Sequence, residues 1–147
     1  MIRTCIHKDM DAVLDIWLAA SIKAHNFVDP AFWQSQVESM RHTYLPASEV
    51  AVYERNSLVV GFYALHGNTL AAIFVQPELQ GQGIGKALLA HAKSQRTELV
   101  LNVYKENKAS CRFYLAQGFQ VISEQKDEHT GHPEYTMRYT SQQVAQS

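Results

Sequence analysis

The chain has 147 residues, 46% of them hydrophobic, and its 13 Lys and Arg residues nearly balance 14 Asp and Glu residues. That length suits one domain with its own hydrophobic core, which needs neither a disulfide nor a metal for stability. The near-zero charge argues against nucleic-acid binding, because proteins of that class usually carry a strong basic excess.

The number of cysteines and the length of the apolar segments indicate in which cellular compartment the protein works. Cys5 and Cys111 are too few for a disulfide framework and too widely spaced for a zinc site, so we expect ordinary thiols and no metal. The first residues lack the apolar stretch of a signal peptide, and no apolar run approaches the ~20 residues of a membrane span. We therefore expect a cytoplasmic protein without a membrane partner.

Helical and strand-like periods alternate along the chain. Strands are predicted at residues 2–6, 49–54, 58–65, 69–75, 98–104, 119–125 and 134–139, and helices near 10–22, 30–45, 83–94 and 108–117. Asp9 and Asp29 are expected to cap the first two helices, and Gly118 to end the last one in a left-handed conformation. The almost wholly apolar strand 69–75 is expected to be buried on both faces. The pattern predicts one α/β (α+β) domain with a mixed sheet of about seven strands and four helices, and a frayed polar tail at 140–147.

The most informative stretch is Gln80-Gly81-Gln82-Gly83-Ile84-Gly85-Lys86, which follows a predicted strand and begins a helix. Glycines allow the backbone to approach a ligand closely, and the first N–H groups of a helix point toward an anion. We therefore expect this loop to bind a phosphate or pyrophosphate.

Two common phosphate-binding motifs do not fit. Only three residues separate Gly81 from Gly85, and Ala87 replaces the hydroxyl residue that the nucleotide P-loop needs after its lysine. The dinucleotide motif Gly-x-Gly-x-x-Gly would require a glycine at position 86, which is lysine.

The pattern Gln/Arg-x-x-Gly-x-Gly/Ala is matched by Gln80, Gly83 and Gly85. With it, the sequence resembles the GNAT superfamily of N-acetyltransferases, here of the small single-domain bacterial type. Asn107 followed by Tyr114 and Gly118-Phe119 is similar to a second segment of that family. The element order is similar over residues 2–139, although the specific motifs cover only 74–119.

The resemblance implies that acetyl-CoA, a co-substrate, lies between the fourth and fifth strands, which should splay apart. Backbone groups of Phe74 and Val75 would pair with the pantetheine arm, and Asn107 would bind it or begin its own helix. The pyrophosphate would lie on the backbone N–H groups of Gln80, Gly81, Gln82, Gly83, Ile84, Gly85 and Lys86. Because the loop carries glutamines rather than arginines, backbone hydrogen bonds should contribute most of the binding.

Tyr114 would be the general acid that protonates the departing thiolate, and it would also border the coenzyme. A phenol with a pKa near 10 is protonated at neutral pH, so it can donate to a thiolate with a pKa of about 8–9.

The general base is less clear. An amine with a pKa of about 10.4 must lose a proton before it attacks, and the strand 69–75 carries no acid. His25 is our first candidate and His66 the second. Asn102 or Tyr104 could instead hold a water molecule, and Asp29 and Glu54 are further candidates for the pocket wall.

Other conspicuous side chains have ordinary explanations. Phe27, Phe32, Trp33 and Tyr63 are expected mainly in the core, although those near 24–33 could line the acceptor pocket. His129 and His132 are expected to be solvated, and an acyl-cysteine at Cys111 is not favoured.

The leading hypothesis is an acyltransferase that moves the acetyl group of acetyl-CoA to a primary amine by direct attack in a ternary complex. The acceptor would be a protein lysine, a protein N-terminus or a small amine, and the enzyme a monomer or homodimer. The alternative is a non-catalytic acyl-CoA-binding regulatory module on the same fold. An acetylating toxin that acts on charged tRNA would need a basic groove, which the charge balance disfavours.

Overall fold

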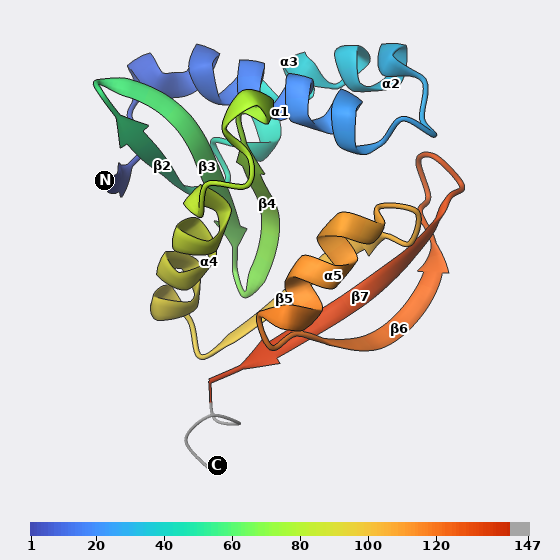
Figure 1. Cartoon of the computed structure of the whole chain (residues 1–147). Coiled ribbons are helices and arrows are strands. Elements are labelled where there is room, and N and C mark those ends of the chain that lie inside the picture. The colour runs from blue at the N-terminus through green and yellow to red at the C-terminus, as the bar shows by residue number, and fades with distance from the viewer. Residues whose placement is uncertain (142–147) are drawn as a thin grey trace. The chain divides into compact units, whose positions relative to one another are not determined.

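The computed structural model describes residues 1–141, and the chain divides into two compact units, residues 1–92 and residues 93–147. The elements follow the predicted order (Figure 1). The first unit contains β1 (Ile2–Thr4), α1 (Met10–Ala24), α2 (Pro30–Ser35), α3 (Val37–Ser39), β2 (Glu49–Arg55), β3 (Leu58–His66), β4 (Thr69–Val75) and most of α4 (Ile84–Gln95). The second unit contains the end of α4, then β5 (Glu98–Tyr104), α5 (Lys108–Ala116), β6 (Gln120–Lys126) and β7 (Pro133–Thr140).

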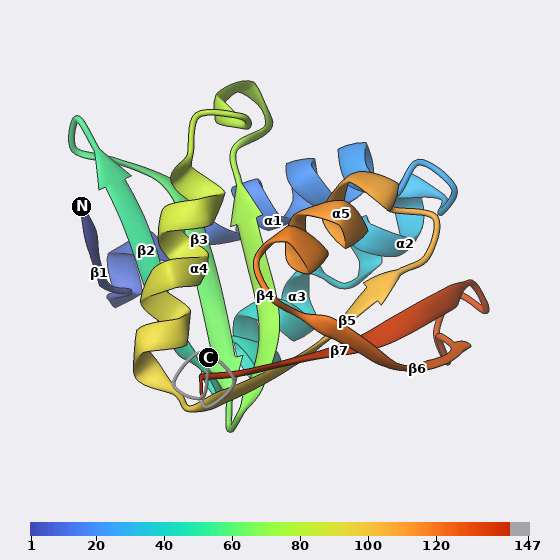
Figure 2. The same ribbon diagram turned by 60° about the horizontal axis from the view of Figure 1, so that its bottom comes forward.

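In the first unit, β1, β2, β3 and β4 pair in chain order, each antiparallel to the next. Asn56 and Ser57, both at positive φ (54° and 65°), form the two-residue turn between β2 and β3. This is the geometry that matches the twist of a hairpin. Helix α1 packs against β3 and β4, and α4 crosses the other face of the sheet (Figure 2).

Gly61 of β3 lies where α4 and β4 leave little room for a side chain. A Cβ atom at Gly61 would lie 3.0 Å from Leu88 Cδ1 and 3.1 Å from the carbonyl oxygen of Phe74. The absence of a side chain at this position therefore sets the distance between the helix and the sheet.

In the second unit, β7 pairs with both β5 and β6, antiparallel in each case. Asn107 caps α5, since its Oδ1 accepts from Ser110 N at 3.3 Å. Gly118 follows the helix at φ 92°, as predicted, and its N–H donates to the Leu115 carbonyl.

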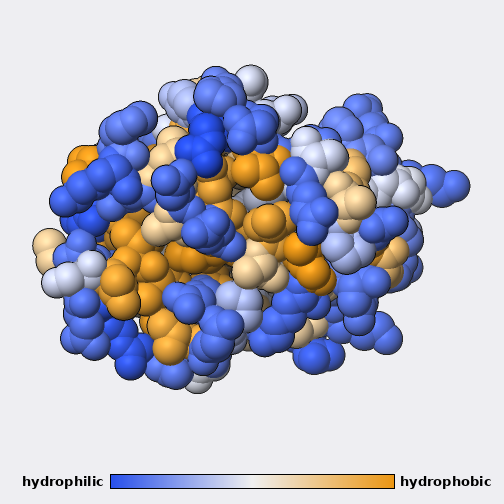
Figure 3. Space-filling model, turned by 90° about the horizontal axis from the view of Figure 1, so that it is seen from above, coloured by the Kyte–Doolittle hydropathy of each residue, from blue (hydrophilic) through white to orange (hydrophobic). Residues whose placement is uncertain are grey.

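Each unit has an apolar core. Val13, Val52, Phe62, Leu65 and Leu88 are among the largest fully buried side chains of the first unit, and Leu99, Phe119 and Met137 are among those of the second. Some large apolar residues reach the surface, among them Ile6, Leu58, Leu115 and Ile122. In the view from above, apolar residues lie among hydrophilic ones (Figure 3). No helix within residues 1–141 is long and apolar enough to cross a membrane.

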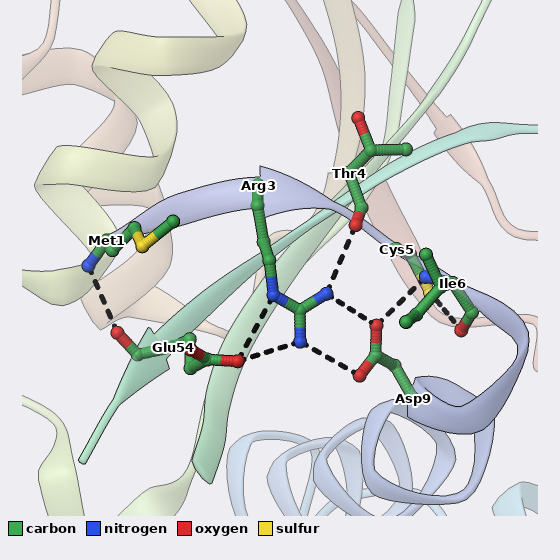
Figure 4. Close-up of polar contacts among 7 residues, drawn as sticks. All are labelled: Met1, Arg3, Thr4, Cys5, Ile6, Asp9 and Glu54. Carbon is green, nitrogen blue, oxygen red and sulfur yellow. Dashed lines mark hydrogen bonds and ion pairs between the residues drawn. The ribbon is translucent and has the colours of Figure 1, made fainter. Parts of the chain in front are cut away.

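Asp9 is the N-cap residue of α1, as predicted, but its side chain makes no capping hydrogen bond, so the expected side-chain cap is wrong. Its carboxylate accepts instead from the backbone N–H of Ile6 (2.9 Å) and from both terminal nitrogens of Arg3 (2.8 and 3.0 Å). The same guanidinium donates to Glu54 Oε1, so Arg3 of β1 joins β2 to the start of α1 (Figure 4). Arginine bonds hold the pKa of Asp9 below its usual range. The bidentate ion pair with Arg3 is thus formed in place of a capping bond to α1, and it is strong because the Asp9 carboxylate is only 5% exposed.

Three other predictions need correction. The single helix expected at 30–45 is broken into α2, α3 and a π-helical turn at Met40–Tyr44. Strand β4 is not buried on both faces, since Leu70 and Ala72 are buried while Ala71 between them is exposed. The predicted tail begins too early, because Thr140 ends β7; residues 142–147 lie outside the described part.

Candidate active site

The glycine-rich loop joins β4 to α4 in the first unit. Gly81 and Gly83 have φ values of 84° and 86°, and a Cβ at either position would meet nothing within 4 Å. Glycine is therefore needed here for its backbone conformation and not for lack of space. The first helical residue, Ile84, is buried, whereas Lys86 is exposed on the first turn of α4.

The loop is tied to the strand that precedes it. Gln80 Nε2 donates to the carbonyl oxygen of Val75 at 3.3 Å. Val75 is buried and Phe74 is half-buried at the end of β4, so the predicted pantetheine-pairing residues adjoin the predicted pyrophosphate loop.

Two cationic side chains reach this loop, and the sequence analysis missed both. Arg55 Nη1, at the end of β2, donates to Gln82 Oε1 at 2.8 Å. Lys23 Nζ, near the end of α1, lies 3.5 Å from Gln80 Oε1. The loop that looked neutral in sequence therefore has two positive charges beside its glutamines. The β2–β3 hairpin pattern alone could not indicate that Arg55 faces a loop 27 residues further on.

The second predicted segment lies in the second unit. Asn107 begins α5 and Tyr114 lies near its end, half-buried between the rings of Phe113 and Phe119 at 5.4 and 5.6 Å between centroids. Burial among apolar groups raises the pKa of the Tyr114 phenol. The hydroxyl is therefore firmly protonated at neutral pH.

His25 ends α1 and is 8% exposed. Its ring lies 5.1 Å from the Trp33 ring and 5.8 Å from the Phe27 ring. Burial lowers its pKa to about 4, and a hydrogen bond with the Ser21 backbone only partly opposes this effect. The imidazole is thus neutral at physiological pH and is a weak base.

Most of the other polar residues considered for the general base or the pocket wall form hydrogen bonds within the fold. Tyr104 donates its hydroxyl proton to Asp127 at 2.7 Å, and Asn102 accepts from Thr136 at 2.7 Å. Asp29 caps α2 through Ala31 N, as predicted, whereas His66 is exposed at the end of β3. Glu54 is bonded to Arg3 as described above.

Trp33 (8% exposed) and Tyr63 (3% exposed) belong to the core, as expected, while Phe27 and Phe32 are half-buried. Burial raises the pKa of the Cys111 thiol, which disfavours a thiolate nucleophile. His129 is exposed, but His132 is bonded to Glu106 at 3.0 Å and is not simply solvated.

Comparison with known proteins identifies the family. Residues 46–121 match the model of the acetyltransferase (GNAT) domain, so the chain belongs to the GNAT acetyltransferase family. It is 31% identical over 140 residues to the peptidyl-lysine N-acetyltransferase YiaC of Escherichia coli K12, covering 95% of this chain and 96% of that one. It is also 32% identical over 134 residues to the peptidyl-lysine N-acetyltransferase YjaB of the same strain, covering 90% of each chain.

Solved structures agree on the fold. The solution structure of apo-form YjaB from E. coli has a TM-score of 0.83 at 27% identity, over 95% of this chain and 96% of that chain. The PaiA N-acetyltransferase of Thermoplasma acidophilum, solved with coenzyme A, has a TM-score of 0.80 at 19% identity, over 95% and 98%. The predicted fold class is confirmed, and the protein is an acetyltransferase that acts on an amine rather than a regulatory module.

Proposed function

We propose that the chain transfers the acetyl group of acetyl-CoA to the side-chain amine of lysine in a protein or peptide. The observation that carries this choice of acceptor is the similarity to YiaC and YjaB, two peptidyl-lysine N-acetyltransferases that align over at least 90% of this chain. We also propose that the protein acts in the cytoplasm, as the sequence analysis predicts.

Acetyl-CoA would be held by backbone and side-chain groups that suit its phosphates. The backbone N–H groups of residues 81–86 would face the pyrophosphate at the start of α4, where the helix dipole also favours an anion. The N–H of Gln80 donates to the Pro77 carbonyl, so Gln80 would contribute through its position in the loop. Arg55 and Lys23 would add charge to this binding through their positions beside Gln82 and Gln80. Phe74 and Val75 would pair with the pantetheine arm, and Asn107 would contribute from the start of α5.

When bound, acetyl-CoA supplies an activated thioester. The lysine nitrogen would attack the carbonyl carbon directly, so that the C–N bond forms while the C–S bond breaks. A backbone N–H at Phe74 or Val75 would polarise the carbonyl oxygen. Tyr114 would donate its phenolic proton to the sulfur. Burial raises the pKa of the phenol, which keeps it protonated at neutral pH and also makes it a weaker acid.

The attacking nitrogen loses two protons in all, and the second, released once the C–N bond has formed, would return to the Tyr114 phenolate. The first must leave the ammonium before attack. His25 stays our candidate for the group that accepts it, because burial keeps the imidazole neutral. With a pKa of about 4, however, it can hold that proton only transiently, so the proton would pass on to solvent.

The test is acetylation of a matched set of amines, followed by mass spectrometry. One peptide carries an internal lysine and a blocked N-terminus, a second carries a free N-terminus and no lysine, and spermidine represents small amines. We expect acetyl-lysine on the first peptide, and a fall in kcat of about 100-fold in Y114F, since general acid catalysis contributes at least that much. Turnover of only the second peptide or only spermidine would contradict the choice of acceptor.

A further inference from the structure

Lys93 of the second unit is held by one hydrogen bond and two aromatic rings, although burial lowers the pKa of its ammonium. Its Nζ donates to the carbonyl oxygen of Gln117 at 2.5 Å. It also lies 4.4 Å from the centroid of the Tyr139 ring and 6.0 Å from that of Phe119. The side chain is half-buried, so these contacts are poorly screened by water.

The carbonyl that Lys93 binds belongs to the C-terminal end of α5. Gln117 is the C-cap residue of that helix, and its backbone N–H donates to the carbonyls of Phe113 and Tyr114. The free carbonyls at a helix C-terminus carry partial negative charge, which a nearby ammonium stabilises. Lys93 therefore supplies the hydrogen-bond donor and the charge that this helix end requires.

Residues that lie close to Lys93 also contact Tyr114. The backbone N–H of Phe119 donates to the Tyr114 carbonyl at 3.1 Å, and the two rings lie 5.6 Å apart, edge to face. Phe119 is 2% exposed and stacks on Tyr139 at 5.6 Å, the ring beneath the Lys93 ammonium. A displacement of Lys93 would thus loosen both the last turn of α5 and the ring that fixes the Tyr114 side chain.

We propose that Lys93 is a positioning residue for acetyl transfer, which holds the end of α5 so that the Tyr114 phenol keeps its proton-donating orientation. This rests on the proposed role of Tyr114. The charge is essential to it, because the alkyl stem alone offers neither a donor for Gln117 nor a cation for Tyr139. A small displacement of a catalytic group lowers kcat strongly, whereas binding of the coenzyme phosphates depends on a different part of the chain.

The experiment is a double-mutant cycle of K93M with Y114F. Methionine keeps an unbranched apolar stem and removes the charge and the donor, while K93R keeps both. K8M changes an exposed lysine of the first unit and serves as the control. For each variant, kcat, the KM for the lysine peptide, the Kd for coenzyme A and urea unfolding are measured. Amide hydrogen exchange at Gln117 and Phe119 is followed in parallel.

We expect K93M to lower kcat about 10-fold, to change KM and Kd less than about two-fold, and to speed exchange at Gln117 and Phe119. K93R should recover most of the lost kcat, and in the Y114F background K93M should lower kcat less than about two-fold. If K93M does not fold, K93Q, which keeps an amide donor without the charge, replaces it.

The outcomes separate the two proposals. An equal loss of kcat from K93M in both backgrounds, or no loss in a folded variant, would overturn the positioning role of Lys93. A Y114F enzyme with wild-type kcat would overturn the role of Tyr114 itself, whatever the result at Lys93.

Discussion

Lowering the pH should destabilise the protein because His25 becomes protonated. This should begin at a pH well above the pKa values of carboxylates. The pKa of a histidine in an unfolded chain is near 6.5, whereas burial lowers that of His25 to about 4. Between these values the unfolded state binds the proton more tightly, so the free energy of unfolding must fall as the pH decreases. Stability from this group is fully present above pH 6.5 and is lost as the pH falls toward 4.

The size of the effect follows from the two pKa values. Between pH 7.5 and pH 4.5, linkage gives a loss of about 2.5 kcal/mol for a shift from 6.5 to about 4. This is a substantial part of the 5–15 kcal/mol typical of a domain. Asp9 contributes almost nothing in this interval, because its pKa is lowered and its stabilisation is lost only at more acidic pH.

The assay is urea unfolding at a series of pH values, followed by the fluorescence of the buried residues Trp17 and Trp33. The H25Q variant should lose the pH-dependent part, so that its stability changes by about 2.5 kcal/mol less than wild type over the interval. H66Q, at an exposed histidine, should keep the wild-type profile. A wild-type decrease that persists unchanged in H25Q would refute the reasoning, since another group would then be responsible.

Three further predictions concern the first unit. R55Q should raise the Kd for coenzyme A about 3- to 10-fold, measured by calorimetry, because a positive charge is lost beside Gln82. The increase should be larger at low salt, where charges are less screened. An unchanged Kd at low salt would contradict a role of Arg55 in binding. G61A should lower the free energy of unfolding, measured by urea unfolding, by about 1–3 kcal/mol, because the new methyl group meets Leu88 and the β4 backbone. An unchanged free energy of unfolding would show that α4 can move away from the methyl group at no cost. D9N should cost about 1–3 kcal/mol at pH 7, since it leaves the Arg3 guanidinium without its buried carboxylate partner. The cost should begin to shrink as the pH falls below about 3.8, the ordinary value from which the Asp9 pKa is lowered. A cost independent of pH would exclude the ion pair as its cause.

Local signals predicted local structure well. Asp29 before Pro30, and Gly118 after an amphipathic helix, each act within a few residues of their own position. The glycine loop was found in the same way, because positive φ at Gly81 and Gly83 is a property of that short segment.

Features that depend on distant residues could not be found in this way. Asp9 has the residue type and position of a helix cap, yet Arg3 and Glu54 draw it into an ion-pair network. Arg55 approaches Gln82 only because β2, β3 and β4 fold into one sheet, so no pattern near either residue indicates the contact. The broken helix after Pro30 likewise shows no proline or glycine within residues 31–45.

The glycine-rich loop has one consequence for the thermodynamics of coenzyme binding. Three glycines within five residues would leave an isolated loop with great conformational freedom, and a ligand that ordered it would lose affinity as a result. Here the bonds from Gln80 to Val75 and from Arg55 to Gln82 hold the loop in shape within the folded chain. The entropy cost of ordering the loop is therefore met during folding, so a phosphate bound there, as we propose, would not have to order it.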